Sequence, residues 1–224
     1  MLLRRLMIET GNQWVAGNNV VVIPTTWRTS GNIGPGLTFY DGGLTVLRPY
    51  SGNDSYYNCT ATVRSRNSGK AYAEVEVGRD GGGWSGECGL IPAAATITSW
   101  PQNNSPVSGI SINVSAGGGY NCWMVIDGSG GIHLADGTKA GPGIIGIAVD
   151  FDAGKCWLRH LGANRWVKPD GTILSSLDVS QPTYTFTPGT DMAIMGMSPF
   201  DGAYAKLVQG PTFTYPAPSG FGAW

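Results

Sequence analysis

Two aspartates are the first residues in this sequence whose types and spacing suggest chemistry. Asp150 and Asp152 lie two residues apart in the stretch IIGIAVDFDAGKCWLRHL, residues 144–161, and carboxylates spaced in this way can bind a metal ion or transfer protons. A calcium loop that starts at Asp150 requires glycine at its sixth position and glutamate at its twelfth. Those positions hold Lys155 and Leu161. The spacing therefore argues against calcium, and we predict no metal site.

A second pair of carboxylates, Glu74 and Glu76, belongs to the stretch GKAYAEVEVG, residues 69–78. Retaining glycosidases hold two carboxylates about 5–5.5 Å apart, and residues two apart on one face of a strand can provide that spacing. The β-glucanases that use this arrangement carry E-x-D-x-x-E, whereas Arg79 stands here at the last position. We expect a solvated strand face at Glu74 and Glu76, and keep a glycan-active hydrolase or lyase as the alternative function.

No other group of residues indicates catalysis. His133 and His160 are the two histidines and no G-x-S-x-G motif is present, so neither a nucleophilic triad nor a histidine-rich metal site is indicated. The four cysteines form no C-x-x-C pair, and we expect them to be free, packed thiols. We predict a protein that is not an enzyme, with no catalytic residues, no metal and no cofactor.

The composition limits the classes of partner. Hydrophobic residues make up 42% of the 224 residues, and 14 lysines and arginines balance 15 aspartates and glutamates. With no excess of positive charge, the chain is not expected to form the basic surface that nucleic-acid binding requires. The start, MLLRRLMIETGNQW, is interrupted by Arg4, Arg5 and Glu9, so it does not match a secretion signal. We expect synthesis in a cytoplasm without a signal peptide, no membrane span and no nucleic-acid partner.

The elements that must position these residues are strands. Apolar and polar residues alternate along many short runs, and Gly-rich turns such as Asp170-Gly171 and Asp201-Gly202 separate the runs. In residues 69–78, Ala71, Ala73, Val75 and Val77 share one face of a predicted strand. Many short strands joined by such turns predict an all-β fold, an antiparallel β-sandwich or jelly roll.

The aspartates of the opening stretch fall between two such strands. Alternation predicts one strand up to Phe151 and another from Cys156 to Leu161. Between them Asp152 can accept backbone N–H bonds and Gly154 can supply a positive φ, as a tight turn requires. We therefore predict that Asp152 and Gly154 are structural turn residues of a hairpin.

The pattern also divides the chain. We predict an N-terminal strand and arm in residues 1–38, a β-sandwich in residues 39–210 and an extended tail in residues 211–224. The tail carries several prolines, and it either packs along the sandwich or reaches a neighbouring molecule.

Tryptophans are the remaining candidates for binding. Trp84 and Trp100 lie in Gly/Pro-rich loop context, where an exposed aromatic ring can contact a sugar or a protein. Trp123 and Trp157 lie in predicted strands, and we expect them in the core. Trp84 and Trp100 are therefore the predicted binding residues.

Several stretches together resemble one family, the SPRY domains. SGKAYAEVEV (68–77) resembles the family's SGKWYWEV strand, and GIIGIAVDFDAGKCWLRHLG (143–162) is similar to its GDVIGVALDLDAGKLWFRKNG hairpin. The chain departs from the pattern at Ala71 and Ala73, where aromatic residues are usual. The resemblance implies a concanavalin A-like sandwich that binds partners through loops at one end and has no catalytic residues.

The ending PSGFGAW, residues 218–224, is similar to the C-termini of SPRY-like proteins in tailed-bacteriophage virions. This resemblance implies a virion component (tail, fibre, collar or capsid decoration) that recognises other virion proteins or a host-surface glycan or protein. Such proteins assemble symmetrically, so we expect a homo-oligomer in which the two ends of the chain serve as docking arms. A stand-alone carbohydrate-binding module is the remaining alternative.

Overall fold

A computed structural model describes most residues of the chain. These are residues 8–10, 13–16, 19–22, 25–31, 33–49, 56–79, 85–97, 100–101, 108–115, 121–127, 131–134, 143–162, 164–198, 201–210 and 212–224. Within these ranges, no helix is long and apolar enough to cross a membrane.

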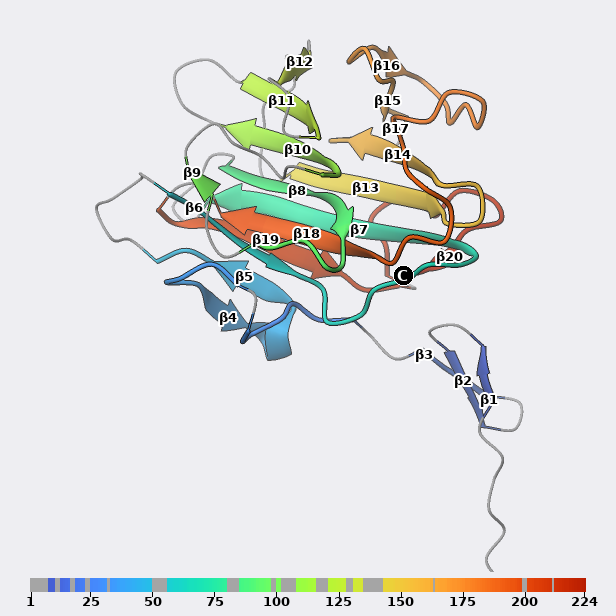
Figure 1. Cartoon of the computed structure of the whole chain (residues 1–224), viewed down its shortest axis with the longest axis horizontal. Helices are drawn as coiled ribbons and strands as arrows, with labels where there is room; N and C mark the ends of the chain where they lie inside the picture. Colours follow the sequence, from blue (N-terminus) through green and yellow to red (C-terminus); the bar gives the residue numbers. More distant parts are fainter. Residues whose placement is uncertain are drawn as a thin grey trace, which may run out of the picture.

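Two large sheets stack on each other to form a β-sandwich (Figure 1). The first contains seven strands, in the order β12 (Ile132–Leu134), β11 (Asn121–Ile126), β10 (Ile110–Ser115), β8 (Ser85–Pro92), β18 (Met192–Ser198), β6 (Tyr56–Ala61) and β9 (Trp100–Pro101). All their pairings among the described residues are antiparallel.

The second sheet contains ten strands. Along its main path they are β16 (Ile173–Leu174), β15 (Trp166–Val167), β14 (Lys155–His160), β13 (Gly143–Asp150), β7 (Lys70–Arg79), β19 (Ala203–Val208), β5 (Thr45–Leu47) and β4 (Thr38–Tyr40). Two short strands lie off this path: β17 (Tyr184–Thr185) pairs with β14, and β20 (Gly222–Ala223) pairs in parallel with β7. A 3₁₀ turn, η1 (Asp41–Gly43), joins β4 to β5, and β1 (Ile8–Thr10), β2 (Gln13–Ala16) and β3 (Asn19–Val22) form a separate three-stranded sheet. The predicted antiparallel sandwich is confirmed.

The hydrophobic core fills the space between the two large sheets. Alternate residues of β7 contribute Ala71, Ala73, Val75 and Val77, as the alternation predicts, and the seven-stranded sheet contributes residues such as Ile112. The core is therefore continuous from sheet to sheet.

The core extends past both ends of the range 39–210 that the sequence assigns to the sandwich. The Trp27 indole is buried, lies over Gly196 and donates to the Ala205 carbonyl at 3.2 Å. At the other end of the chain, the Trp224 ring is 5% exposed and lies 5.5 Å from the ring of Phe151. Residues close to both ends thus belong to the same packed core.

The β13–β14 hairpin is the stretch that carries Asp150 and Asp152. Its turn, residues 151–154, connects Asp150 to Lys155, which are register partners. Asp150 accepts the N–H of Ala153 at 3.0 Å, and Asp152 accepts the N–H of Gly69 at 3.1 Å. Asp150 therefore closes the turn, while Asp152 ties it to the connection that precedes β7.

Gly154 stands at the end of this turn with φ +62°, a conformation that favours glycine. A Cβ there would lie 2.1 Å from the Phe186 carbonyl oxygen, so close approach of the backbone also requires glycine. Ile97 follows β8 and is buried against the outer side of the seven-stranded sheet.

Candidate functional site

Glu74 lies on the outer face of the ten-stranded sheet, and it is not solvated as the alternation predicts. Its side chain is fully buried, because residues 212–224 cross this face and cover it. We call residues 212–224 the C-terminal segment. The expectation of a solvated strand face was therefore wrong for Glu74, since a chain segment distant in sequence replaces the solvent.

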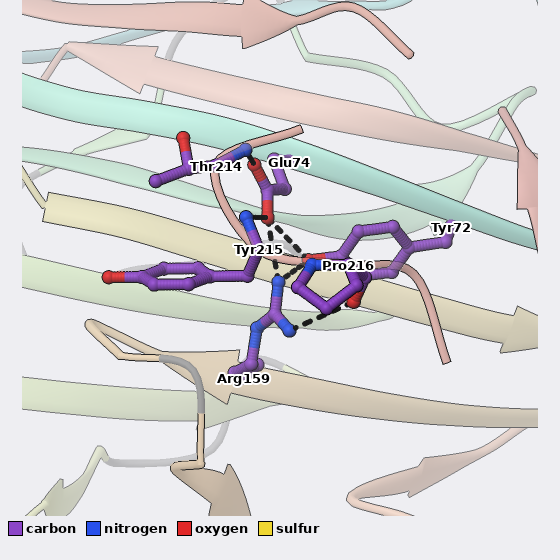
Figure 2. Close-up of polar contacts among 6 residues, drawn as sticks. All are labelled: Tyr72, Glu74, Arg159, Thr214, Tyr215 and Pro216. Atoms are coloured by element: carbon purple, nitrogen blue, oxygen red, sulfur yellow. Dashed lines mark hydrogen bonds and ion pairs between the residues drawn. The ribbon is translucent and has the colours of Figure 1, made fainter. Parts of the chain in front are cut away.

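The Glu74 carboxylate is surrounded by hydrogen-bond donors (Figure 2). Its Oε1 accepts from Arg159 Nη2 at 2.7 Å, from the Tyr72 hydroxyl at 2.8 Å and from the Tyr215 N–H at 3.0 Å. Its Oε2 accepts from the Thr214 N–H at 2.6 Å. Four donors converge on one carboxylate, and an acceptor-only, ionised Glu74 satisfies all of them.

Arg159 is the cation of this cluster and is itself buried. Besides Glu74, its guanidinium donates to the Tyr72 hydroxyl and, at 3.4 Å, to the Pro216 carbonyl. It also lies 4.7 Å from the ring centroid of Tyr215 and 5.4 Å from that of Trp166. Arg159 thus binds both the sheet and the C-terminal segment.

Burial acts on both members of the pair. Burial raises the pKa of Glu74, while the N–H groups of Tyr215 and Thr214 oppose that shift. Burial also lowers the pKa of Arg159 to about 10, against the opposing influence of Tyr215. Each direction reflects the cost of removing a charge from water.

Glu76 is the other half of the predicted carboxylate pair. It is half-buried, and its Oε1 accepts the Tyr204 hydroxyl at 2.9 Å. The two glutamates share a strand face, as the sequence predicts, but Glu74 is closed off by the C-terminal segment. Both carboxylates accept hydrogen bonds from groups of the fold itself.

The aspartates of the β13–β14 hairpin are also engaged within the fold. Asp150 Oδ2 lies 3.0 Å from Lys70 Nζ. Burial alone raises the pKa of Asp150, but Lys70 and the N–H groups of Ala153 and Asp152 together outweigh it and hold the pKa below its usual range. No group of three or more metal-ligating side chains occurs within the described part of the chain.

Trp84 and Trp100 are the two tryptophans predicted to bind. Trp84 lies outside the described residues, between the end of β7 and the start of β8. The backbone of Trp100 is in β9, paired with Tyr57 of β6 at the edge of the seven-stranded sheet. Their role in binding stays a prediction.

Trp123 was expected in the core, but it is an exposed aromatic residue. It is 38% exposed, because its neighbours Cys122 and Met124 take the core positions of β11 and Trp123 points to the outer face. The expectation for Trp123 was therefore wrong. Trp157 is buried as expected, but in a smaller apolar cluster on the outer face of the ten-stranded sheet.

Trp123 belongs to a row of side chains that crosses the outer face of the seven-stranded sheet. Its register partners are His133 on one side and Asn113 on the other, and Asn113 is in turn opposite Glu87. The exposed His133 ring contacts the Trp123 ring edge-on, with centroids 5.1 Å apart. We call Trp123, His133 and Asn113 the Trp123 row.

Glu87 of β8 holds Asn113 of this row in place through a hydrogen bond. The carboxylate is buried, accepts from the Ser111 hydroxyl and receives the Asn113 side-chain amide at 3.0 Å. Cys59 and Cys88 nearby are free and buried; burial, and after it the Glu87 charge, raises the pKa of both thiols. The Asn113 amide is thus held in one orientation beside the exposed indole.

The sequence holds signals for both the Glu74–Arg159 pair and the exposed Trp123. Trp157 and Arg159 alternate with Cys156 and Leu158, which places the arginine on an outer face, yet only the β7–β13–β14 pairing brings it to Glu74. For Trp123, the strict alternation with cysteine and methionine was the signal that could have placed it outside.

Comparison with known proteins supports the architecture. No protein-family model matches the sequence, and no curated protein matches it significantly. The structure is similar to the crystal structure of the TRIM65 PSpry domain, with a TM-score of 0.51 and 14% identity over 82% of this chain and 91% of that one. The fold is SPRY-like. This SPRY-like fold agrees with the resemblance carried by the hairpin at residues 143–162.

Proposed function

We propose that this SPRY-like chain is a non-enzymatic binding module that contacts a protein partner through the Trp123 row. The observation that carries the proposal is the exposure of Trp123, 38% of its surface, on a sheet face where its indole is held beside His133 and Asn113. Tryptophan is enriched among the residues that dominate binding energy at protein interfaces. A ring on a rigid strand also loses little conformational entropy on binding.

The position of the row agrees with binding at one end of the sandwich. Trp123 lies two residues from Asn121, the first residue of β11, which is level with Ser115 and Ser85 in the register. The connection that contains Trp84 ends at Ser85. A partner on the Trp123 row would therefore lie near the first residues of β8 and β11, at one end of the sandwich, where loops commonly carry recognition residues.

The resemblance of the ending PSGFGAW to SPRY-like virion proteins supports a narrower proposal. The chain would then be a bacteriophage virion component that binds another virion protein or a host-surface molecule within a symmetric assembly. Particle fractionation tests this part: the chain should sediment with intact particles, and its recovery only in the soluble fraction would exclude it.

The protein-binding proposal is tested by photo-crosslinking in cells that make the full chain. A photoreactive phenylalanine analogue replaces Trp123 in one variant and Tyr40, which is 49% exposed on the other sheet, in a control. We expect a discrete protein adduct from position 123 and none of the same mass from position 40. The same adducts from both positions would exclude a site at the Trp123 row.

The two alternatives give different results. A carbohydrate-binding module would bind a glycan array in a manner that Trp123→Ala abolishes, with no protein adduct. A hydrolase using Glu74 and Glu76 would release reducing ends from a bacterial polysaccharide, and Glu76→Gln would abolish that release. Either result would replace the present proposal.

A further inference from the structure

The C-terminal segment is held in the manner of a bound peptide. We propose that the outer face of the ten-stranded sheet and the adjoining edge of β7 together form a peptide-binding site, occupied here by residues 212–224, that also accepts the same segment of a second copy of this chain. We call the side chains that form it, Tyr72, Glu74, Trp157, Arg159 and Trp166, the segment-binding face. This inference concerns the sheet opposite the Trp123 row and stands independently of the proposed function.

Recognition at the centre of the face is directed at the peptide backbone. Glu74 accepts the consecutive N–H groups of Thr214 and Tyr215 at 2.6 and 3.0 Å, and Arg159 donates to the Pro216 carbonyl at 3.4 Å. A buried carboxylate and a buried guanidinium thus form hydrogen bonds with the backbone of three successive residues, 214–216 (Figure 2). An extended peptide is the ligand that offers such neighbouring donors and an acceptor.

Aromatic contacts on either side of this centre add side-chain recognition. The Phe213 ring meets the Tyr72 ring edge-on at 4.9 Å, and the Phe221 ring meets the Trp157 ring edge-on at 6.0 Å. Tyr215 lies against the Arg159 guanidinium. Apolar or aromatic groups at these positions of the segment therefore define what the face accepts.

The end of the segment adds a short strand to a free stretch of sheet edge. β7 is ten residues long, but β19 pairs with it only from Glu74 to Arg79. β20 takes the remaining edge, with Gly222 opposite Ala71 and Ala223 opposite Tyr72, and the Trp224 N–H donates to the Tyr72 carbonyl at 2.9 Å. Strand addition to an available edge is a known mode of peptide capture.

These contacts are all noncovalent and lie within 13 consecutive residues, so a separate copy of the segment carries every group that the face recognises. In the intact chain the resident segment competes at an effective concentration of about millimolar. A second copy's segment therefore enters only where the resident one is weakened or released.

The test uses a fluorescent peptide with the sequence of residues 212–224, TFTYPAPSGFGAW. The recipient is the full chain carrying Phe213→Ala and Phe221→Ala, which weakens the resident segment and leaves the segment-binding face unchanged. Fluorescence anisotropy should show binding to this variant at least about tenfold tighter than to the wild type, because the wild-type segment competes. Equal binding to both, or none to the variant, would contradict the proposal.

Backbone recognition is tested with modified peptides. Methylation of the Thr214 and Tyr215 nitrogens removes both N–H donors to Glu74 and should weaken binding by at least about tenfold, whereas methylation at the exposed Ser219 serves as the control. Equal affinity of the two methylated peptides would contradict recognition by Glu74.

If the double variant does not fold, a full chain with a protease site before the C-terminal segment tests whether that segment can be exchanged. A protease site placed after Gly210 is cut in the folded full chain, and the labelled peptide is added to the cut complex. Exchange of the resident segment for the labelled peptide supports a site that works between copies. Unfolding after the cut, or a segment that never exchanges, would show that residues 212–224 are an inseparable part of the core.

Discussion

Glu74 and Arg159 lie on strands that are not neighbours, yet their side chains meet at 2.7 Å across Gly146 of the intervening strand β13. Neighbouring strands lie about 4.8 Å apart, so the side chains must reach over the middle strand. They can do so because Gly146, the register partner of both residues, presents no side chain. The ion pair, and with it the covering of this face by the C-terminal segment, therefore depends on a glycine.

Replacing Gly146 by alanine should disturb this arrangement. A Cβ there would lie 2.6 Å from the Tyr72 hydroxyl oxygen and 3.0 Å from Arg159 Nε, so the free energy of unfolding should fall by about 1–3 kcal/mol. Gly222→Ala is the control, because its Cβ would meet nothing closer than the Lys70 carbonyl oxygen at 3.9 Å. Urea unfolding measures both, and equal effects would argue against crowding at Gly146.

The ion pair should contribute more to the placement of the C-terminal segment than to net stability. Glu74→Gln or Arg159→Met alone leaves an unpaired buried charge and should lower the free energy of unfolding by about 3–5 kcal/mol. The double variant should lose less than the sum of the two. Hydrogen exchange should meanwhile show faster exchange at the amides of Thr214 and Tyr215 in every variant that lacks Glu74. Unchanged exchange there would mean that other contacts hold the segment.

A buried tryptophan and an exposed one should respond differently to replacement by alanine. Trp224→Ala removes a core residue that is 5% exposed and should lower the free energy of unfolding by about 3–5 kcal/mol. Trp123→Ala removes a ring on an outer face and should cost about 1 kcal/mol or less. Thermal unfolding of both variants checks this, and a similar loss in the two would contradict the burial described for them.

Acid should weaken the hairpin at Asp150. The pKa of this carboxyl is held below its usual range by Lys70 and backbone N–H groups, which outweigh burial. A depressed folded-state pKa adds stability above the unfolded value of about 3.9, and that stability is lost as the pH falls through the lower folded value. Asp150→Asn should therefore lower stability by about 1 kcal/mol near pH 7.

The difference between wild type and Asp150→Asn should shrink as the pH approaches about 2, because the wild-type carboxyl is then protonated as well. Urea unfolding across this range measures the difference. A constant gap at all pH values would mean that Asp150 acts through packing and not through its charge.

The sequence predicted the sandwich and its clearest hairpin because both depend on local rules. Alternation along residues 71–77 placed the core face of β7 correctly, and the Asp and Gly residues near 150–154 indicated a turn. These signals involve neighbours within a few residues and need no knowledge of the partner strand.

The expectations for Glu74 and Trp123 were wrong for different reasons. Glu74 was expected in solvent, and residues 214 and 215, some 140 positions away in the chain, cover it. Trp123 was expected in the core because it lies in a predicted strand, but the alternation of β11 gives the inner positions to Cys122 and Met124. Long-range covering, which the sequence does not show, decided the case of Glu74, whereas the alternation of β11 decided that of Trp123.

The most direct measurement of the proposed function is the affinity of the purified full chain for the protein that crosslinks at position 123. Isothermal titration compares the wild type with Trp123→Ala and with the exposed control Tyr40→Ala. We predict that Trp123→Ala raises Kd by about thirtyfold, the effect of an interface hot spot of about 2 kcal/mol, while Tyr40→Ala leaves Kd unchanged. An unchanged Kd in a folded Trp123→Ala variant would contradict binding through the Trp123 row.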